Sequence, residues 1–373
     1  MSGGVDSSVA AHLLKEQGHE VVGLFMQNWE EENNNEEGSE CSAEQDYKDA
    51  QSVAESLDIP CYYVNFSREY KEKVFDYFVK EYQAGRTPNP DILCNKEVKF
   101  DVFYHYAKKI GAEKIATGHY AQIELLDDGS AVLKKGIDES KDQSYFLHAV
   151  GEEVFRDVLF PLGAMPKSKV REIAKNLQLK TAHKKDSTGI CFIGEKDFSS
   201  FLSRYTKEMR GEFQTLAGEK LGKTDELYYY TLGQRKGLGL GGAGEPYYVV
   251  GKDIEKKIIY VERGKFHKAL YVDDVFVKDF FWINKNYSFS DKTQLKAKLR
   301  YRQEEQECLV EIISSHEMKL TFLVPQRAAS PGQFAVLYSG DICLGGGVID
   351  RIGSTYHEMK KELPESVSIG TAK

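Results

Sequence analysis

Apolar and polar positions along the first third of the chain predict strands and helices in alternation. Short apolar runs have the length of buried strands at residues 21–26, 61–66 and 114–118. Between these runs apolar residues recur at helical spacing, most clearly at Tyr70, Val74, Phe78 and Tyr82, which we expect to pack in the core. This alternation is typical of an α/β fold with a doubly wound parallel sheet, in which ligands bind at the carboxyl ends of the strands.

The pattern changes after about residue 120, and strands come to dominate. We expect a hairpin that turns at Asp128-Gly129 and a helix over 167–177. Beyond about residue 210 the expected strands are 247–251, 257–261, 294–300, 308–313 and 320–324. The chain is therefore predicted to contain an α/β domain at 1–205, a small central β-rich module at 206–268 and a C-terminal β-barrel with a tail at 269–373.

Composition and charge limit the class of protein. Of 373 residues, 41% are hydrophobic and 29% are charged, as in globular proteins. We expect a cytoplasmic protein, because no apolar run approaches membrane-spanning length and no basic, apolar leader is present. The six cysteines are scattered without a Cys-x-x-Cys pair, which predicts a reducing compartment and no structural metal. A net charge of −8 argues weakly against a nucleic-acid partner, but the 50 lysines and arginines can still cluster.

The opening residues combine glycines, an acid and two hydroxyls directly before an amphipathic run. Their sequence is Met1-Ser-Gly-Gly-Val-Asp-Ser-Ser8. Gly3 and Gly4 permit a tight turn that points successive N–H groups into one concavity, and a helix that begins near Ser7 adds its dipole. This pattern predicts an anion site, although it lacks the Gly-Lys-Ser/Thr of an ordinary P-loop. The alternative is a glycine-rich turn at the start of a surface helix.

A second unusual segment is Arg86-Thr-Pro-Asn-Pro-Asp-Ile-Leu-Cys-Asn-Lys96. Pro88 and Pro90 predict a rigid extended loop that could hold Asp91 and Cys94 at a fixed distance from a substrate. From these residues alone, Asp91 is equally interpretable as a helix N-cap. Cys94 on its own is more typical of a small buried hydrophobe.

A third segment, Lys184-Lys-Asp-Ser-Thr-Gly-Ile-Cys-Phe192, places a cysteine after two lysines. Positive charge beside a thiol lowers its pKa and favours the thiolate, so Lys184 and Lys185 could activate Cys191. The alternative is a surface loop that leads into a strand and buries Cys191. Spacing alone favours this alternative.

Together these segments resemble one family in their residues and in their order. The opening Ser-Gly-Gly-Val-Asp-Ser-Ser is similar to the PP-loop of the ATP pyrophosphatases. The likeness continues through Ala-Thr-Gly-His-Tyr120, Lys-Asp-Gln-Ser-Tyr-Phe146, Tyr-Thr-Leu-Gly-Gln-Arg235, Arg300-Tyr-Arg302 and Ser330-Pro-Gly-Gln333. With the second and third segments included, nearly the whole chain resembles the tRNA-specific 2-thiouridylases.

This resemblance implies a three-domain enzyme that replaces the 2-oxygen of the wobble uridine with sulfur in tRNAs for lysine, glutamate and glutamine. ATP transfers AMP to the C2 oxygen while the opening loop holds pyrophosphate, with Mg²⁺ expected alongside. By resemblance, Cys191 carries the sulfur as a persulfide, Cys94 is its catalytic partner and releases the sulfur by forming a disulfide with it, and Asp91 transfers a proton. The implied sulfur donor is a cysteine desulfurase or a sulfur-relay protein.

The resemblance also assigns binding residues. Positions that match nucleotide contacts are Met1, Ser2, Gly3, Gly4, Val5, Asp6, Ser7, Met26 and Gly118. Positions that match contacts to the target base are Asn89, Pro90 and Asp91, and those that match tRNA contacts are Lys141, Asp142, Gln143, Arg300 and Tyr301. We expect a positive face for tRNA to include also Lys96, Lys99, Lys184, Lys185 and Arg302. Without the resemblance these residues would be a polar turn and a solvated strand face, and we expect His119 to be structural.

One departure from the family pattern concerns the start of the chain. The family has a short apolar strand before the opening loop, whereas Met1 aligns inside the loop here. A phosphate loop in a doubly wound sheet normally follows a central parallel strand. We therefore expect that the sheet lacks this strand and that the natural protein begins about ten residues earlier, from strand length plus a short lead.

Two other functions share parts of this pattern. Other ATP pyrophosphatases, such as amide-forming synthetases and tRNA lysidine synthetases, need the opening loop but not the pair of Cys94 and Cys191. An RNA-binding protein with a degenerate nucleotide site comes from a different class. It would need neither an intact loop nor both cysteines.

Overall fold

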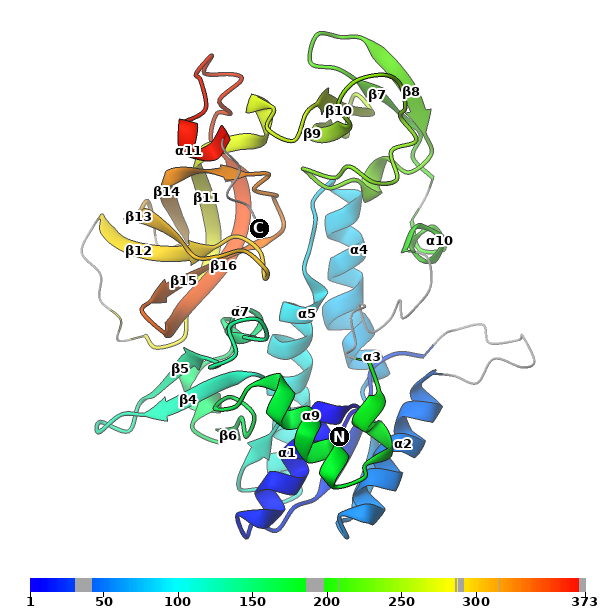
Figure 1. Cartoon of the computed structure of the whole chain (residues 1–373), viewed down its shortest axis with the longest axis vertical. Helices are drawn as coiled ribbons and strands as arrows, with labels where there is room; N and C mark the ends of the chain where they lie inside the picture. The colour runs from blue at the N-terminus through cyan, green and yellow to red at the C-terminus, as the bar shows by residue number, and fades with distance from the viewer. Residues whose placement is uncertain are drawn as a thin grey trace.

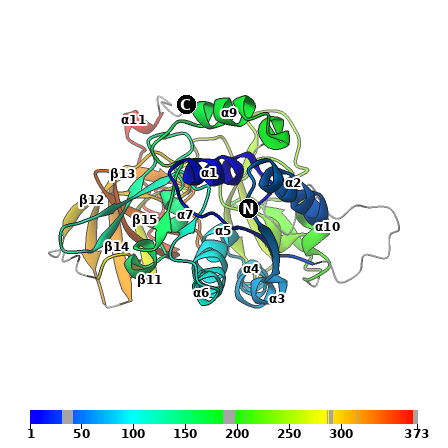
Figure 2. The same ribbon diagram turned by 90° about the horizontal axis from the view of Figure 1, so that it is seen from below.

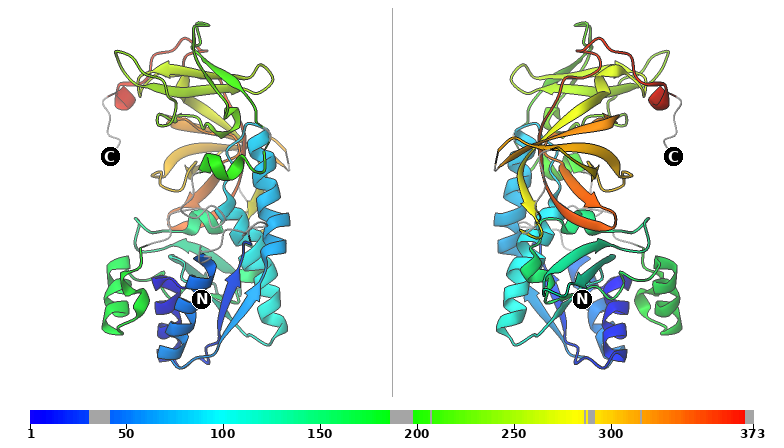
Figure 3. Two further views of the ribbon diagram at one scale, coloured as in Figure 1. Left: turned by 90° about the vertical axis from the view of Figure 1, so that its right-hand side faces the viewer. Right: turned by 90° about the vertical axis from the view of Figure 1, so that its left-hand side faces the viewer.

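The structure is a computed structural model that describes residues 1–30, 42–185, 198–206, 208–285, 287, 292–314 and 316–368. An α/β region comes first in the chain, followed by a small four-stranded sheet and a β-barrel (Figure 1). These parts are stacked along the long axis of the molecule, with the barrel in the middle (Figure 3). The predicted fold class is confirmed.

The α/β region contains most of the helices. In chain order its elements are α1 (Val5–Glu16), β1 (Gly23–Gln27), α2 (Ser42–Ser56), β2 (Cys61–Asn65), α3 (Ser67–Tyr70), η1 (Lys71–Phe75), α4 (Asp76–Gln83), α5 (Pro90–Leu93), η2 (Cys94–Val102), α6 (Phe103–Lys109), β3 (Ile115–Ala116), β4 (Ala121–Leu125), β5 (Ala131–Lys135), α7 (Ser144–Leu147), α8 (Glu152–Phe155), β6 (Val158–Leu159), α9 (Lys167–Asn176) and η3 (Lys180–His183).

Parallel strands in this region form two pairs, β1 with β2 and β3 with β6. Helices lie on both sides of them, with α1, α2 and α9 on one side and α3, α4 and α6 on the other (Figure 2). Val9 of α1, Val53 of α2 and Val170 of α9 share one apolar cluster, whereas Leu24 of β1 packs with Ala107 of α6. The amino group of Met1 donates a hydrogen bond to the carbonyl of Leu24, so the opening loop lies beside β1.

Two long helices contain π-helical turns. Segments α3, η1 and α4 form one helix that buries Tyr70, Val74, Phe78 and Tyr82, as their spacing predicts. Segments α5, η2 and α6 form a second helix that begins at Pro90. The prediction of an extended loop as far as Cys94 is therefore wrong, because proline is well tolerated in the first turn of a helix, where its missing N–H has no intrahelical partner.

The remaining elements are almost all strands. The small sheet has the order β8-β7-β10-β9. Its part of the chain contains α10 (Phe198–Leu202), β7 (Gly211–Gln214), β8 (Lys220–Thr224), η4 (Leu227–Tyr229), β9 (Tyr247–Asp253) and β10 (Ile258–Arg263). The barrel part contains η5 (Lys268–Leu270), β11 (Tyr271–Trp282), β12 (Thr293–Lys298), β13 (Gln306–Ile312), β14 (Glu317–Arg327), β15 (Phe334–Ser339), β16 (Ile342–Ile352) and the short helix α11 (Glu365–Ser368).

The barrel is closed and is extended by a hairpin of the α/β region. Its strands follow the order β11-β14-β13-β12-β15-β16, and β16 pairs with β11. The hairpin of β4 and β5, with Gly129 in its turn at φ +79°, pairs with β16 through Cys343 and Leu133. One apolar cluster therefore contains residues of both regions, among them Ile92 and Phe334.

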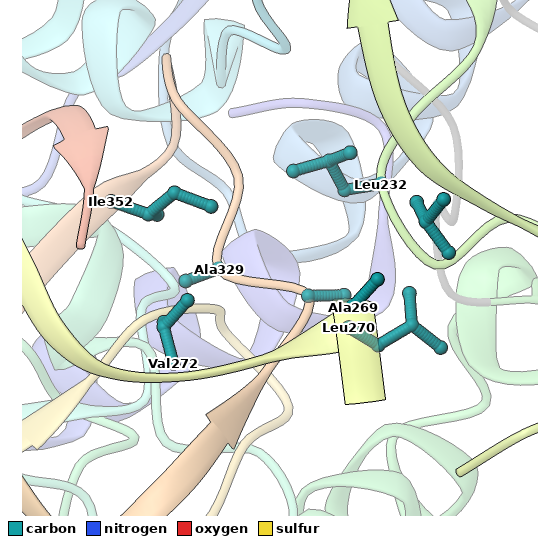
Figure 4. Close-up of a pocket in the computed structure, with 8 residues that line it drawn as sticks. Leu232, Ala269, Leu270, Val272, Ala329 and Ile352 are labelled. Carbon is teal, nitrogen blue, oxygen red and sulfur yellow. The ribbon is translucent and has the colours of Figure 1, made fainter. Parts of the chain in front are cut away.

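An apolar cavity lies where the small sheet meets the barrel, and its volume is about 10 Å³. Figure 4 labels six of its lining residues, Leu232, Ala269, Leu270, Val272, Ala329 and Ile352. A cavity of this size is at the lower limit for one water molecule, and its walls are apolar. We interpret it as a gap in packing.

No helix in the described parts of the chain is long and apolar enough to cross a membrane.

Candidate functional site

The opening loop presents backbone N–H groups at the start of α1. Gly3 has φ +68°, and a Cβ there would overlap the backbone carbonyl of Asp46. Gly4 is extended and has no side chain with which to cap the helix. The hydroxyls of Ser7 and Ser8 donate to the Gly4 carbonyl at 3.3 and 2.8 Å. The first N–H groups of α1 therefore remain suited to an anion, as the glycine pair predicts.

Gly118 packs directly against this loop. A Cβ on Gly118 would lie 2.9 Å from both the Cβ of Asp6 and the backbone nitrogen of Ser7. The structure thus brings together two parts of the expected nucleotide site that are far apart in the sequence. Met26 is near the end of β1, the strand beside the opening loop, and packs against the apolar cluster that contains Cys94.

Asp6 is held by two residues that the sequence analysis missed. The Nζ of Lys167 donates to both carboxylate oxygens of Asp6 at 2.6 and 2.7 Å, and the hydroxyl of Tyr120 donates to one of them at 2.7 Å. Lys167 and Tyr120 are buried. Tyr120 ends the segment Ala-Thr-Gly-His-Tyr120 that carries part of the family likeness, but nothing in its spacing pointed to Asp6, and Lys167 had no distinguishing signal.

Lys184 is occupied by internal contacts. Its Nζ donates to the Gly3 carbonyl at 3.0 Å, to Asp46 at 2.6 Å and to Asp49 at 2.7 Å. The expectation that Lys184 contributes to a positive face for tRNA stays a prediction, and the carboxylates of Asp46 and Asp49 offset its charge. Cys191, which Lys184 was expected to activate, lies outside the described residues.

Asn89, Pro90 and Asp91 form the first turn of the helix that carries Cys94. The side chain of Asn89 accepts a hydrogen bond from the Asp91 backbone nitrogen at 3.2 Å, so Asn89 and not Asp91 is the N-cap. Burial raises the pKa of the Asp91 carboxyl, and the positive charge of Lys99 opposes this shift. An acid with a raised pKa is suited to proton transfer near neutral pH.

Cys94 is buried, with 2% of its surface exposed. It lies in an apolar cluster with Tyr70, Val98 and Phe201, and Met26 packs against the same cluster. Cys94 therefore fits the interpretation as a packed residue, and its chemical role rests on the family resemblance.

The expected tRNA-binding residues come together, but two of them are used internally. Asp142 is buried and accepts hydrogen bonds from the backbone nitrogens of Gly136 and Ser144, each at 3.1 Å. The Oε1 of Gln143 accepts from the Tyr120 backbone nitrogen at 3.0 Å. The Asp142 carboxylate is therefore enclosed and shapes the turn, and the expected contact of this residue with tRNA stays a prediction.

Arg300 and Tyr301 lie next to this turn. The ring of Tyr301 packs on Phe146 of α7 with centroids 4.4 Å apart. The guanidinium of Arg300 donates to the Arg327 carbonyl at 2.7 Å, and this side chain is exposed. Arg300 can therefore still meet an external phosphate.

His119 is buried, and its Nδ1 lies 2.7 Å from the Thr117 hydroxyl. Burial holds the pKa of His119 well below its usual range, and the charge of Lys99 lowers it further. These contacts agree with the expected structural role. The described residues contain no group of three or more His, Cys, Asp or Glu side chains that could hold a metal ion.

Family models match the chain in three consecutive stretches. The tRNA methyl transferase HUP domain matches residues 1–195, the tRNA methyl transferase PRC-barrel domain matches residues 199–263, and the aminomethyltransferase beta-barrel domain matches residues 272–349. The solved structure of NMN synthetase from Francisella tularensis covers 52% of this chain and 67% of that chain, at 21% identity and a TM-score of 0.30. That likeness is too low to carry an argument.

Curated relatives match nearly the whole chain. The tRNA-specific 2-thiouridylase MnmA of Protochlamydia amoebophila (strain UWE25) is 53% identical over 364 residues, which cover 98% of this chain and 96% of that protein. Proteins of the same name from Listeria monocytogenes serotype 4a (strain HCC23) and Staphylococcus aureus (strain bovine RF122 / ET3-1) are 51% and 49% identical, and each match covers 94% of both chains. The chain therefore belongs to the family of the tRNA-specific 2-thiouridylases.

Proposed function

We propose that this protein is an ATP-dependent tRNA-uridine 2-sulfurtransferase that acts in the cytoplasm on the wobble uridine of tRNAs for lysine, glutamate and glutamine. The observation that carries the proposal is the match over 98% of the chain to a relative named for this activity. The opening loop and the Asp91-x-x-Cys94 pair, which the chemistry requires, are both present in the chain.

The first step activates the C2 oxygen, which is a very poor leaving group. That oxygen attacks the α-phosphate of ATP and displaces pyrophosphate, which the N–H groups of residues 2–7 hold at the start of α1. Met26 and Gly118 lie along the nucleotide. Bound Mg²⁺ would supply positive charge to the phosphates, and Asp6, the carboxylate of the loop, would hold it only if its oxygens exchanged the Lys167 ammonium for the metal, since Mg²⁺ usually binds through one or two carboxylates together with phosphates.

The second step transfers sulfur. The terminal sulfur of the Cys191 persulfide attacks C2, and AMP leaves with the C2 oxygen. The Cys94 thiolate, whose proton Asp91 has accepted, then attacks the Sγ of Cys191 and breaks the sulfur–sulfur bond of the adduct. This leaves 2-thiouridine and a Cys94–Cys191 disulfide. A thiol reductant returns both cysteines, and a cysteine desulfurase or a sulfur-relay protein restores the persulfide.

The target base must leave its stack to reach these groups. The flipped base lies beside Asn89, Pro90 and Asp91. To reach Cys94, the base must also displace the apolar side chains that cover this residue. The segment that begins with Lys141, together with Arg300 and Tyr301, contacts the tRNA backbone, where each lost phosphate contact should reduce the salt slope by about one unit.

Mass spectrometry of nucleosides tests the proposal directly. Wild-type protein is incubated with ATP, tRNA, a cysteine desulfurase with cysteine as the persulfide source, and a thiol reductant, and 2-thiouridine is expected at the wobble position. Cys94→Ser and Cys191→Ser should each abolish the product. Cys61→Ser and Cys308→Ser are the controls, because Cys61 is on β2 and Cys308 is inside the barrel. A methylated or lysidine-containing nucleoside, or full thiolation by either of the first two variants, would contradict the proposal.

A further inference from the structure

The loop before α5 is bonded to the C-terminal barrel through the backbone of Thr87. The Thr87 nitrogen donates to the Pro331 carbonyl at 2.9 Å. The Nε2 of Gln333 donates to the Thr87 carbonyl at 2.8 Å and to the Pro88 carbonyl at 3.4 Å. The backbone N–H and the carbonyl of Thr87 are thus both hydrogen-bonded to residues about 245 positions further along the chain.

The barrel backbone also packs against this loop. Gly332 has φ +92°, and a Cβ there would lie 2.8 Å from the Thr87 nitrogen and 2.9 Å from the Arg86 Cβ. Residues 331–333 are themselves fixed to β16, because the Gly332 nitrogen donates to the Ile349 carbonyl at 2.9 Å and the Ile349 nitrogen donates to the Gln333 carbonyl at 2.7 Å. The contact is therefore made by a rigid part of the barrel.

Further contacts hold the loop from other sides. The Nε of Arg86 lies 2.8 Å from the carboxylate of Glu81 on α4, and its guanidinium lies 3.6 Å from Asp350 on β16. The hydroxyl of Thr87 lies 3.2 Å from the hydroxyl of Thr231, which precedes β9. The α/β region, the small sheet and the barrel therefore all contribute to the position of the loop.

This loop leads without a break into the helix that carries Asp91 and Cys94. Ile92, between those two residues, is fully buried in the cluster that contains Phe334, the neighbour of Gln333. A displacement of about 1 Å in a reacting group can reduce a rate by about a hundredfold. The direction in which the helix starts is set at Thr87, four residues before Asp91.

We propose that Gln333 is a positioning residue for sulfur transfer, and that the barrel acts in the reaction by fixing Thr87 and Pro88 so that Asp91 and Cys94 meet the base. This inference rests on the proposed function. It assigns to the barrel a role in the chemical step.

Two pairs of variants test it in the full chain. Gln333→Glu keeps the size and shape of the side chain but replaces the donor with a carboxylate that can only accept, so it should repel both carbonyls. Its control is Gln294→Ala, which removes an exposed amide that donates to Glu307 on the same barrel. Gly332→Ala pushes against Thr87, and its control is Gly340→Ala, which has a similar φ of +58° but no described atom within 4 Å of the new Cβ.

The measurements separate positioning from folding and from tRNA contact. For Gln333→Glu and Gly332→Ala we expect the single-turnover thiolation rate at saturating tRNA to fall by about ten- to a hundredfold, with KM values for tRNA and ATP close to wild type and a Tm that stays above the assay temperature. Gln294→Ala should match wild type, and Gly340→Ala should keep the wild-type rate and KM values while its left-handed φ lowers its Tm slightly. Gln333→Ala should lie between wild type and Gln333→Glu, because it removes the donor without adding repulsion.

Three outcomes would overturn the inference. They are an unchanged rate in Gln333→Glu, a rise in the KM for tRNA at an unchanged rate, and an equal loss in Gly332→Ala and Gly340→Ala. Absence of thiolation by the wild-type protein would instead contradict the proposed function.

Discussion

Substitution of Gly118 by alanine should weaken ATP binding through one steric contact. Its φ is not in the left-handed region, so alanine adds no backbone strain there. The added Cβ would lie 2.9 Å from the Asp6 Cβ, the Asp6 carbonyl carbon and the Ser7 nitrogen, about 0.5 Å inside the 3.4 Å at which ordinary contact begins. All three atoms belong to the backbone or are fixed to it, so the start of α1 has to move.

The size of the effect follows from the cost of overpacking. Forcing an extra methyl group into a well-packed site typically costs about 1–3 kcal/mol. If that strain is relieved by displacing the loop, the dissociation constant for ATP should rise by about 5- to 150-fold. If the loop keeps its position, the same free energy should appear as a lower Tm.

Calorimetric titration with ATP measures the change in the dissociation constant, and thermal denaturation measures the change in Tm. Gly241→Ala is the matched control, because Gly241 also lacks a left-handed φ and no described atom lies within 4 Å of its added Cβ. Wild-type values for both the ATP dissociation constant and the Tm of Gly118→Ala would refute the reasoning, since the contact would then have been relieved at no cost.

Three further predictions concern other parts of the site. Lys167→Met should reduce the free energy of unfolding by about 1–3 kcal/mol, because it leaves the partly buried charge of Asp6 without its cation. Thermal or denaturant unfolding measures this loss, and Lys167→Arg should restore part of it. Lys99→Met should move the acid limb of the pH–rate profile to higher pH, because Lys99 opposes the rise in the Asp91 pKa and the ionised carboxylate is the proton acceptor in the proposed mechanism. Lys99→Arg should leave the limb in place, and a limb that does not move in Lys99→Met would contradict the assignment. Burial raises the pKa of the Cys308 thiol to about 12, so Cys308 should resist iodoacetamide in the native protein and react after unfolding, as peptide mass spectrometry can check.

Periodicity in the sequence was sufficient to predict the elements that pack by one face. The series from Tyr70 to Tyr82 is buried at every position, because four-residue spacing puts all its members on one side of a helix. The hairpin at Asp128-Gly129 was equally predictable, because Gly129 adopts the positive φ that such turns require. Pro90 misled the prediction, although Asn89 before it and Asp91 after it form a pattern that is typical of a helix N-terminus.

Contacts between distant segments could not be predicted from spacing. The partner of Asp6 is 161 residues away, and the partner of Thr87 is 246 residues away. The spacing of apolar residues predicts whether a segment is a helix or a strand. It does not predict which distant segment packs against it, because that depends on how the regions dock. The motif Ser330-Pro-Gly-Gln333 was visible as a family match, but its contact with residues 86–88 was not.

The pairing of the β4–β5 hairpin with β16 has a consequence for how the molecule unfolds. Leu133 and Tyr145 from the first half of the chain share one apolar cluster with Val336 and Cys343 from the barrel. Separating the two regions would expose this cluster and leave Ile342 and Cys343, at the start of β16, without their partners on β5, and exposed apolar surface of this kind favours aggregation. The α/β region and the barrel should therefore lose structure in a single cooperative transition, and a fragment that begins at the barrel should not be stable as an independent module.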